Sequence, residues 1–271
     1  MPEPRPAPVT VPVVRASKRS SGHAPLVMVT AYDAPGARIA DAAGVDMILV
    51  GDSVGTNVLG YREELQVTIE DMAHHTAAVA RARPKPLIVA DMPWMSYHLD
   101  PVETVRNGAT LIRAGAQAVK LEGGANRVPM IEALVAAEIP VMGHLGLTPQ
   151  SINTMGGYRV QGRDDAAALT LDTWAKAIVG AGCFAVVIEG VPETVGAAIT
   201  ESLEVPTIGI GAGPACDGQV LVFHDVVGLN ASAPKFVRRY ADLGQAATDA
   251  VAAYAADVRS GAFPSDAEVY H

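Results

Sequence analysis

The segment RAGAQAVKLEG (113–123) decides the fold class, because its outline recurs as AAGVDMILVG (42–51) and as GAGCFAVVIEG (180–190). In each copy an Ala-Gly pair ends an alanine-rich stretch and leads into a short apolar run of strand character. The glycines of the three pairs stand 71 and 67 residues apart, which is about two strand-plus-helix units per step. Strands that are apolar on both faces and alternate with helices predict a parallel sheet covered by helices.

Eight apolar runs of this kind follow one another along the chain. They are PLVMVTAYD (25–33), DMILVGDS (46–53), PLIVAD (86–91), QAVKLEG (117–123), IPVMGHLG (139–146), FAVVIEG (184–190), PTIGIGAG (206–213) and QVLVFHD (219–225). Helical patterns between them include 68–82, 101–115, 127–138, 166–182 and 192–204. We therefore expect one α/β domain folded as a (β/α)8 TIM barrel, with an open, doubly wound sheet as the alternative.

The two ends of the chain differ from this repeating part. Residues 1–24 are rich in proline, serine and basic side chains, so we expect an N-terminal arm that is flexible or forms an extra element. The barrel and its C-terminal helices are assigned to 25–271. Within this range, 234–260 is typical of one or two amphipathic helices that close the barrel or contact a neighbouring subunit.

Composition excludes several classes of protein. The 271 residues carry 20 Lys and Arg against 29 Asp and Glu, a net charge of −9 that would repel nucleic acid. No stretch resembles a membrane span or a secretory signal, so we expect a cytoplasmic protein with neither nucleic-acid nor membrane partners. Cys183 and Cys216 lack metal-ligand spacing, and Cys183 lies in an apolar run. We expect neither a disulfide nor a zinc site.

Polar residues gather where the expected strands end, which is where barrel enzymes place their reactive groups. They are Asp52 with Ser53, Asp91, Lys120 with Glu122, His144, and Glu189. Because strand side chains alternate between faces, Lys120 and Glu122 share one face. If the apolar residues two positions before Asp91 and Glu189 fill the barrel, these two carboxylates cap it.

Each of these residues also has a structural alternative. Asp52 and Asp91 could each cap a following helix, and His144 could be a core histidine. Lys120, flanked by apolar residues, needs an anionic partner, which Glu122 could supply for purely structural reasons. Four carboxylates, one lysine and one histidine on five strand ends exceed what capping requires, so we favour a functional site.

The donor set indicates the kind of cofactor. Oxygen ligands without a histidine pair or cysteines favour a hard cation, Mg²⁺ before Ca²⁺ or Zn²⁺. We expect Asp52 and Asp91 to bind it and Glu122 to reach it or to hold one of its waters. Glu189, two strands further round, is placed to accept a proton from a bound substrate. A metal with a separate carboxylate base suits enolate formation next to a carbonyl.

The glycine-rich segment IGIGAGP (208–214) follows the seventh expected strand. Barrels often bind phosphate in this position. Here the β-branched residues favour a strand that turns sharply at Gly211 and Gly213, so we expect close backbone packing rather than phosphate capture.

Ordered blocks from about Met28 to the C-terminus give this sequence a close resemblance to the ketopantoate hydroxymethyltransferase (3-methyl-2-oxobutanoate hydroxymethyltransferase) family of pantothenate synthesis. The blocks are VTAYD, LVGDSVG, VTIEDMAHHTAAV, ADMPWMSY, AVKLEGG, GHLGLTPQSIN, GGYRVQGR, IEGVP and IGIGAG-x₃-DGQVLV-x-HD. The proline-rich N-terminal arm departs from the family's commoner helical opening.

The resemblance implies roles for individual residues. It implies metal binding by Asp52 and Asp91, with Glu122 as a further metal-associated carboxylate. Ser53 and Lys120 match positions that hold the α-keto acid. Glu189 matches the proton acceptor, and His144 is carried over only as a possible pocket residue.

The resemblance also implies a two-substrate reaction. The keto acid 3-methyl-2-oxobutanoate would chelate Mg²⁺, lose its C3 proton, and attack the methylene group of 5,10-methylenetetrahydrofolate to give ketopantoate. Family members form homo-oligomers, typically decamers. The rivals are another Mg²⁺-dependent α-keto acid barrel enzyme, of the phosphoenolpyruvate mutase or isocitrate lyase type, and a non-catalytic scaffold. The mutase-type enzymes would carry a reactive cysteine loop or an arginine cluster, and a scaffold would have no use for buried carboxylates.

Overall fold

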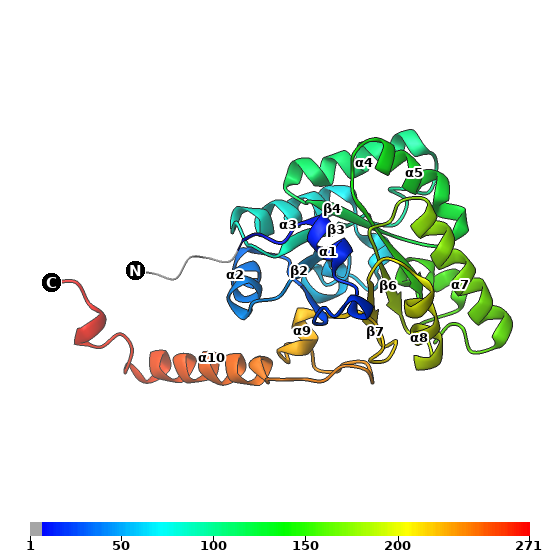
Figure 1. The fold of residues 1–271 in the computed structure, drawn as a ribbon. Helices are drawn as coiled ribbons and strands as arrows, with labels where there is room; N and C mark the ends of the chain where they lie inside the picture. The colour runs from blue at the N-terminus through cyan, green and yellow to red at the C-terminus, as the bar shows by residue number, and fades with distance from the viewer. Residues whose placement is uncertain (1–6) are drawn as a thin grey trace. The chain divides into compact units, whose positions relative to one another are not determined.

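The eight expected strands close into a parallel barrel in the computed structural model, which describes residues 7–271 (Figure 1). The strands are β1 (Leu26–Thr30), β2 (Met47–Val50), β3 (Leu87–Asp91), β4 (Ala118–Glu122), β5 (Val141–Gly146), β6 (Ala185–Glu189), β7 (Thr207–Ile210) and β8 (Gly218–Leu221). Each strand pairs with the next, and β8 pairs with β1. The TIM-barrel prediction is therefore confirmed, and the open-sheet alternative is wrong.

Helices surround the barrel. They are α2 (Ala34–Ala43), α3 (Ile69–Arg81), α4 (Pro101–Ala114), α5 (Val128–Ala136), α7 (Asp165–Gly180) and α8 (Glu193–Ser202), with the short α6 (Ile152–Met155) after β5. Helices α3, α4, α5, α7 and α8 coincide with the predicted helical ranges. Asp33, Thr68, Asp100 and Asp164 accept backbone N–H groups at the first turns of α2, α3, α4 and α7. Sequence-coded caps thus fix where four helices begin.

The regular alternation ends at β7. In the described chain no helix separates β7 from β8, and residues 211–217 make the connection. Gly213 has φ +85°, and a Cβ there would lie 2.6 Å from Cγ of Glu193 at the start of α8. A side chain at position 213 would therefore clash with α8, as expected from close packing of this segment.

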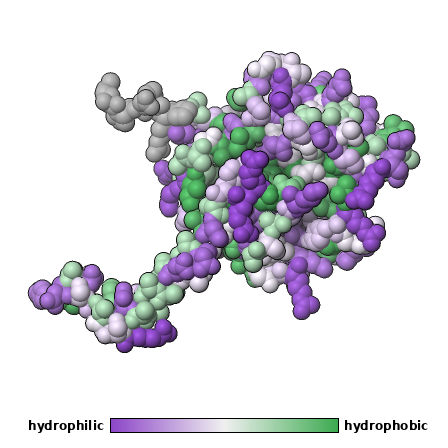
Figure 2. All heavy atoms as spheres, turned by 90° about the horizontal axis from the view of Figure 1, so that it is seen from below, coloured by the Kyte–Doolittle hydropathy of each residue, from purple (hydrophilic) through white to green (hydrophobic). Residues whose placement is uncertain are grey.

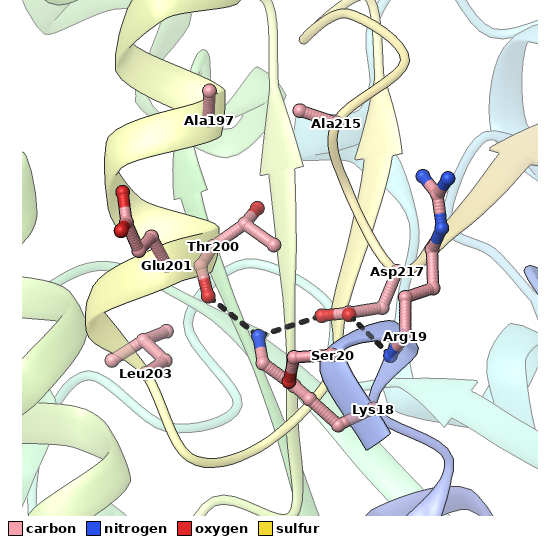
Figure 3. A pocket seen from close by; sticks show the side chains of 9 residues that line it. All are labelled: Lys18, Arg19, Ser20, Ala197, Thr200, Glu201, Leu203, Ala215 and Asp217. Atoms are coloured by element: carbon pink, nitrogen blue, oxygen red, sulfur yellow. Dashed lines mark hydrogen bonds and ion pairs between the residues drawn. The ribbon is translucent and has the colours of Figure 1, made fainter. Parts of the chain in front are cut away.

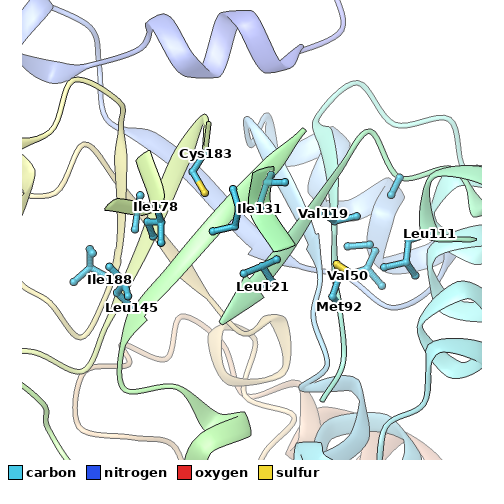
Figure 4. Packing of buried hydrophobic residues seen from close by; sticks show 14 of the residues in the cluster. Val50, Met92, Leu111, Val119, Leu121, Ile131, Leu145, Ile178, Cys183 and Ile188 are labelled. Carbon is cyan, nitrogen blue, oxygen red and sulfur yellow. The ribbon is translucent and has the colours of Figure 1, made fainter. Parts of the chain in front are cut away.

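The core has two layers, separated by the barrel wall. The inner layer fills the barrel with Leu26, Met28, Met47, Leu49, Leu87, Val89, Ala118, Met142, Phe184, Ala185, Val187, Ile208 and Val220. The outer layer joins the strands to the helices, as Ile178 and Cys183 do around β5 and β6 (Figure 4). Alternate residues of one strand thus belong to different layers, which explains why the strands read as continuously apolar.

The segment before β1 closes one end of the inner layer. Helix α1 (Val11–Ala16) places the fully buried Val14 in the inner cluster, and Val9 and Val11 pack against it. Figure 1 shows α1 lying over the barrel. The predicted arm, 1–24, includes residues 1–6, which lie outside the described residues.

Residues Phe223–His271 form a second compact unit, distinct from Met1–Val222. It contains α9 (Phe223–Val226) and α10 (Leu243–Ser260), and α10 has no buried residue. Apolar and polar side chains are mixed over its surface (Figure 2). The predicted helical stretch 234–260 is helical only from Leu243. No described helix is long and apolar enough to cross a membrane.

Candidate functional site

Strand register brings the predicted polar residues to one end of the inner layer. Asp91 of β3 pairs in register with Lys120 of β4, and Glu122 of β4 pairs in register with His144 of β5. Lys120 and Glu122 lie two and four residues after Ala118, which belongs to the inner layer, so all three share the inward face, as the sequence pattern predicted. All four side chains are buried. The carboxyl end of the barrel is therefore closed by charged rather than apolar side chains.

Lys120 is held by Asp91 and His144. Its Nζ lies 2.9 Å from Oδ1 of Asp91 and 3.2 Å from Nδ1 of His144. Burial lowers the pKa of Lys120, but the carboxylates of Asp91, Glu122 and Asp52 outweigh burial and raise it above its usual value. Lys120 is therefore a permanent cation, and its close ion pair is with Asp91 rather than with the Glu122 suggested by the structural alternative.

Asp52 lies directly after β2, beside Asp91. Its backbone N–H donates to Oδ2 of Asp91 at 3.0 Å, and its own Oδ2 accepts from Nε2 of Gln150 at 2.7 Å. Burial, followed by the charges of Asp91 and Glu122, raises the pKa of Asp52 well above its usual value. The site thus holds more negative charge than Lys120 neutralises.

His144 joins Glu122 to Glu189. Its Nδ1 lies 3.3 Å from Oε1 of Glu122, and its Nε2 lies 3.1 Å from Oε2 of Glu189. Burial and the nearby Lys120 lower the pKa of His144, but the two carboxylates reverse this and raise it. The side chain of Glu189 is 14% exposed against 3% for Glu122, so Glu189 is the more accessible of the two from the barrel mouth.

Ser53 belongs to a chain of hydroxyl groups. Its Oγ lies 2.9 Å from the hydroxyl of Tyr32, which accepts from Oγ1 of Thr30 at 3.0 Å. A Cβ at Gly51 would lie 2.8 Å from Oγ of Ser53 and 3.5 Å from Oδ2 of Asp91. Glycine at position 51 therefore leaves room for these two polar groups.

Two residues of the site were missed in the sequence. Gln150, on the 3₁₀ turn Pro149–Ser151 after β5, contacts Asp52 through its side chain and Oε2 of Glu122 through its backbone N–H at 3.0 Å. Tyr97, beyond β3, donates to Oε1 of Gln150 at 2.5 Å and accepts from the backbone N–H of Glu122 at 3.1 Å. Both lie in loops, whereas the sequence pattern singled out only residues at the ends of strands. Their place in the blocks ADMPWMSY and GHLGLTPQSIN was the only available signal.

The capping alternative is wrong for Asp52 and Asp91. Neither is the N-cap of a described α-helix, and their side chains bond within the acidic site. His144 likewise faces charged partners rather than a backbone carbonyl alone.

The donor set fits a small hard cation. Asp52 and Asp91 offer buried carboxylate oxygens at the ends of adjacent strands, and burial, followed by the charges of Asp91 and Glu122, raises the pKa of Asp52. A cation bound there would favour the ionised form of this carboxyl group. Within residues 7–271, no three acidic, histidine or cysteine side chains are grouped as a complete metal site. Mg²⁺ tolerates this, since it commonly takes one or two protein carboxylates and completes its octahedron with water and substrate oxygens.

A separate cavity of about 490 Å³ lies at the other end of the strands, before β1 and β8 (Figure 3). There Nζ of Lys18 lies 2.8 Å from Oδ2 of the buried Asp217 and donates to the backbone oxygen of Thr200. The close cation–carboxylate pair is internally satisfied. None of the residues that line this cavity belongs to the acidic site.

The model of the ketopantoate hydroxymethyltransferase family matches residues 8–266 of this chain. The chain belongs to this family. It is thus a hydroxymethyltransferase, a one-carbon transferase of pantothenate biosynthesis. The alternative of a non-catalytic scaffold is therefore wrong.

Relatives in the family cover nearly the whole chain. The 3-methyl-2-oxobutanoate hydroxymethyltransferase of Methylobacterium sp. (strain 4-46) is 56% identical over 262 residues, 96% of this chain and 90% of its own length. That of Pyrobaculum calidifontis is 52% identical over 252 residues, 93% of this chain and 95% of its own length.

Solved structures outside the family share the fold. A phosphonopyruvate hydrolase in complex with oxalate and Mg²⁺ has a TM-score of 0.62 at 16% identity, covering 96% of this chain and 91% of its own. A 2,3-dimethylmalate lyase of the PEP mutase/isocitrate lyase superfamily also has a TM-score of 0.62, at 18% identity, covering 98% and 90%. The mutase-type rival is thus related to this chain by fold.

Proposed function

We propose that this chain transfers a hydroxymethyl group from 5,10-methylenetetrahydrofolate to 3-methyl-2-oxobutanoate, giving ketopantoate, in a Mg²⁺-dependent reaction. Family membership supports the reaction class and the keto acid. The observation that carries the mechanism is the placement of carboxylates around the barrel mouth. β2 and β6 are four strands apart in a closed barrel of eight, so Asp52 and Glu189 end strands on opposite sides.

Asp52 and Asp91 are the proposed metal ligands. They are adjacent and buried, and Lys120 is paired with Asp91 rather than with Asp52. Glu122 contacts Gln150 and His144 through its two oxygens, which suits a carboxylate that holds a water of the ion. Bound Mg²⁺ would supply electrophilic stabilisation of the oxyanion that develops on the keto oxygen.

Ser53 and Lys120 are the proposed contacts for the keto acid. The Lys120 ammonium keeps its charge among carboxylates, so it can donate a charge-assisted hydrogen bond to the substrate carboxylate. Ser53 already shares its hydroxyl with Tyr32, which orients it. With Asp52 and Asp91 holding the metal end, these groups fix the keto acid in one orientation.

Glu189 is the proposed general base. It is the more exposed member of the Glu122–His144–Glu189 series, and His144 lies 3.1 Å from its Oε2. His144 thereby limits the rotation of the carboxylate through this one oxygen. Removal of the C3 proton by Glu189 produces the carbon nucleophile that takes up the one-carbon unit of the folate. Water supplies the hydroxyl oxygen of ketopantoate, and tetrahydrofolate is released. The folate co-substrate rests on family membership.

The decisive assay follows 3-methyl-2-oxobutanoate by proton NMR in D₂O, with enzyme and Mg²⁺, with and without 5,10-methylenetetrahydrofolate. We expect loss of the C3 proton signal without the folate and formation of ketopantoate with it. Neither exchange nor product at saturating Mg²⁺ would overturn the proposal.

We also propose that the chain is a homo-oligomer, a decamer by family resemblance. Helix α10 supports this, because its apolar residues Leu243, Val251, Tyr254 and Val258 are between 44% and 66% exposed. Light scattering on the purified protein tests the proposal, and a monomer at micromolar concentration would contradict it. The cytoplasmic location stays a prediction.

A further inference from the structure

Gln150 occupies a connecting position behind the proposed metal ligands. It lies after β5, yet its atoms reach residues that follow β2 and β3 and the last residue of β4. It is 6% exposed, so its polar groups depend on protein partners. A buried glutamine that touches Asp52 and Glu122 at once has few ways to change conformation.

The hydrogen bonds of the Gln150 amide fix which end faces Asp52. Nε2 donates to Oδ2 of Asp52 at 2.7 Å and to the backbone oxygen of Met92 at 3.0 Å. Both partners are acceptors, and two donor hydrogens serve them. A flipped amide would set its oxygen against a carboxylate and a carbonyl, which is repulsive. The donor end of Gln150 therefore faces Asp52.

Tyr97 fixes the other end of the same amide. Its hydroxyl oxygen accepts from the backbone N–H of Glu122 and its proton is donated to Oε1 of Gln150. Tyr97 is 1% exposed, so this hydroxyl is shielded from bulk solvent. The series Glu122 N–H, Tyr97 O–H, Gln150 amide, Asp52 carboxylate points all its donors in one direction, which strengthens each bond.

We propose that Gln150 is a positioning residue that holds the Asp52 carboxylate in its ligand orientation, with Tyr97 locking the amide. In this role Gln150 acts through its hydrogen bond to Asp52 and not as a ligand itself. The inference rests on the proposed function, since it takes Asp52 as a metal ligand. Groups that orient metal ligands typically contribute about 10–100-fold to metal affinity.

The test measures Mg²⁺ binding by calorimetry in the presence of 3-methyl-2-oxobutanoate, together with steady-state kinetics. Gln150→Leu keeps the approximate volume and removes the amide, and Gln150→Glu sets a carboxylate against Asp52. We expect both to weaken Mg²⁺ about 10–100-fold, with kcat at saturating Mg²⁺ and keto acid changed less than KM. Tyr97→Phe frees the amide but keeps its contact with Asp52, and it also removes the acceptor of the Glu122 backbone N–H. It should weaken Mg²⁺ binding less than Gln150→Leu.

Gln117→Leu is the matched control. Its Oε1 accepts the backbone N–H of Ile88 at the amino end of the strands, so it should leave Mg²⁺ affinity unchanged. Thermal melting of every variant confirms that the protein tested is folded, and Gln150→Glu, which preserves shape, replaces Gln150→Leu if the latter does not fold.

The double variant Gln150→Leu/Asp52→Asn separates the possible failures. If Gln150 acts only through Asp52, the double variant should bind Mg²⁺ no more weakly than Asp52→Asn alone. Normal Mg²⁺ affinity in Gln150→Leu and Gln150→Glu, with weak affinity in Asp52→Asn, overturns this inference alone. Normal affinity in Asp52→Asn itself overturns the metal assignment of the proposed function. Fully additive losses would show that Gln150 does not act through Asp52.

Discussion

Nζ of Lys120 lies 2.9 Å from Oδ1 of Asp91 at the carboxyl end of the barrel, and the two side chains are 4% and 3% exposed. A similar pair, Lys18 with Asp217 at 2.8 Å, lies at the amino end. The barrel thus has a buried lysine–aspartate pair at each end. The pair at the carboxyl end lies close to two further carboxylates, Asp52 and Glu122, which act on the charge of Lys120.

Because the two ion pairs are similar, Lys18 provides a matched control for the role of Lys120 in substrate binding. Lys120→Met should raise the KM for 3-methyl-2-oxobutanoate, because the substrate carboxylate loses its cation. Lys18→Met also breaks a buried pair, which typically costs about 3–5 kcal/mol of stability, but it should leave that KM unchanged. Steady-state kinetics beside urea unfolding separates the two effects. If Lys120→Met lost stability without any change in KM, its role would be structural only.

Asp52 and Asp91 should act jointly on the metal. A cation with two protein carboxylates cannot lose one and keep its affinity, so Asp52→Asn and Asp91→Asn should each weaken Mg²⁺ and keto acid binding together. Isothermal titration of each ligand in the presence of the other measures this. The assignment is wrong if both variants bind both ligands as the wild type does.

The sequence predicts the barrel well because its strands are apolar on both faces and its helices begin at caps that can be read locally, such as Asp100 before Pro101. Strand alternation also placed Lys120 and Glu122 on one inner face. Strand alternation did not predict which anion pairs with Lys120. That depends on the register of β3 against β4, which places Asp91 beside Lys120. Gln150 was missed because its bond to Asp52 spans 98 residues.

Helix α1 should stabilise the barrel from its amino end. Val14 is fully buried in the inner layer, whereas the neighbouring Val13 is 53% exposed. Val14→Ala should lower the free energy of unfolding by about 1–3 kcal/mol through lost burial and a cavity. Val13→Ala should change it by less than about 0.5 kcal/mol. Equal effects in urea unfolding would contradict the packing of α1 against the inner layer.

Acid should destabilise the protein partly through His98. Burial, followed by the charge of Arg127, lowers the pKa of His98 to about 4 from 6.5, while Glu122 opposes this. Between pH 6.5 and 4 the unfolded chain therefore binds more protons at this residue than the folded chain does. This contribution to stability is present above pH 6.5 and is lost as the pH falls to 4.

His98→Gln removes that proton binding. The free energy of unfolding of His98→Gln should therefore depend less steeply on pH between 4 and 6.5 than that of the wild type, as urea unfolding at several pH values would measure. Identical slopes would show that His98 keeps an ordinary pKa in the folded protein.

Glu189→Gln tests whether Glu189 removes the C3 proton of the keto acid. Glutamine keeps the shape and the reach toward His144 but is not a base. Proton NMR in D₂O with Mg²⁺ and 3-methyl-2-oxobutanoate should show exchange at C3 slowed by about 10²–10⁴-fold, with keto acid and Mg²⁺ bound nearly as before. Exchange at the wild-type rate in Glu189→Gln would show that another group removes the C3 proton.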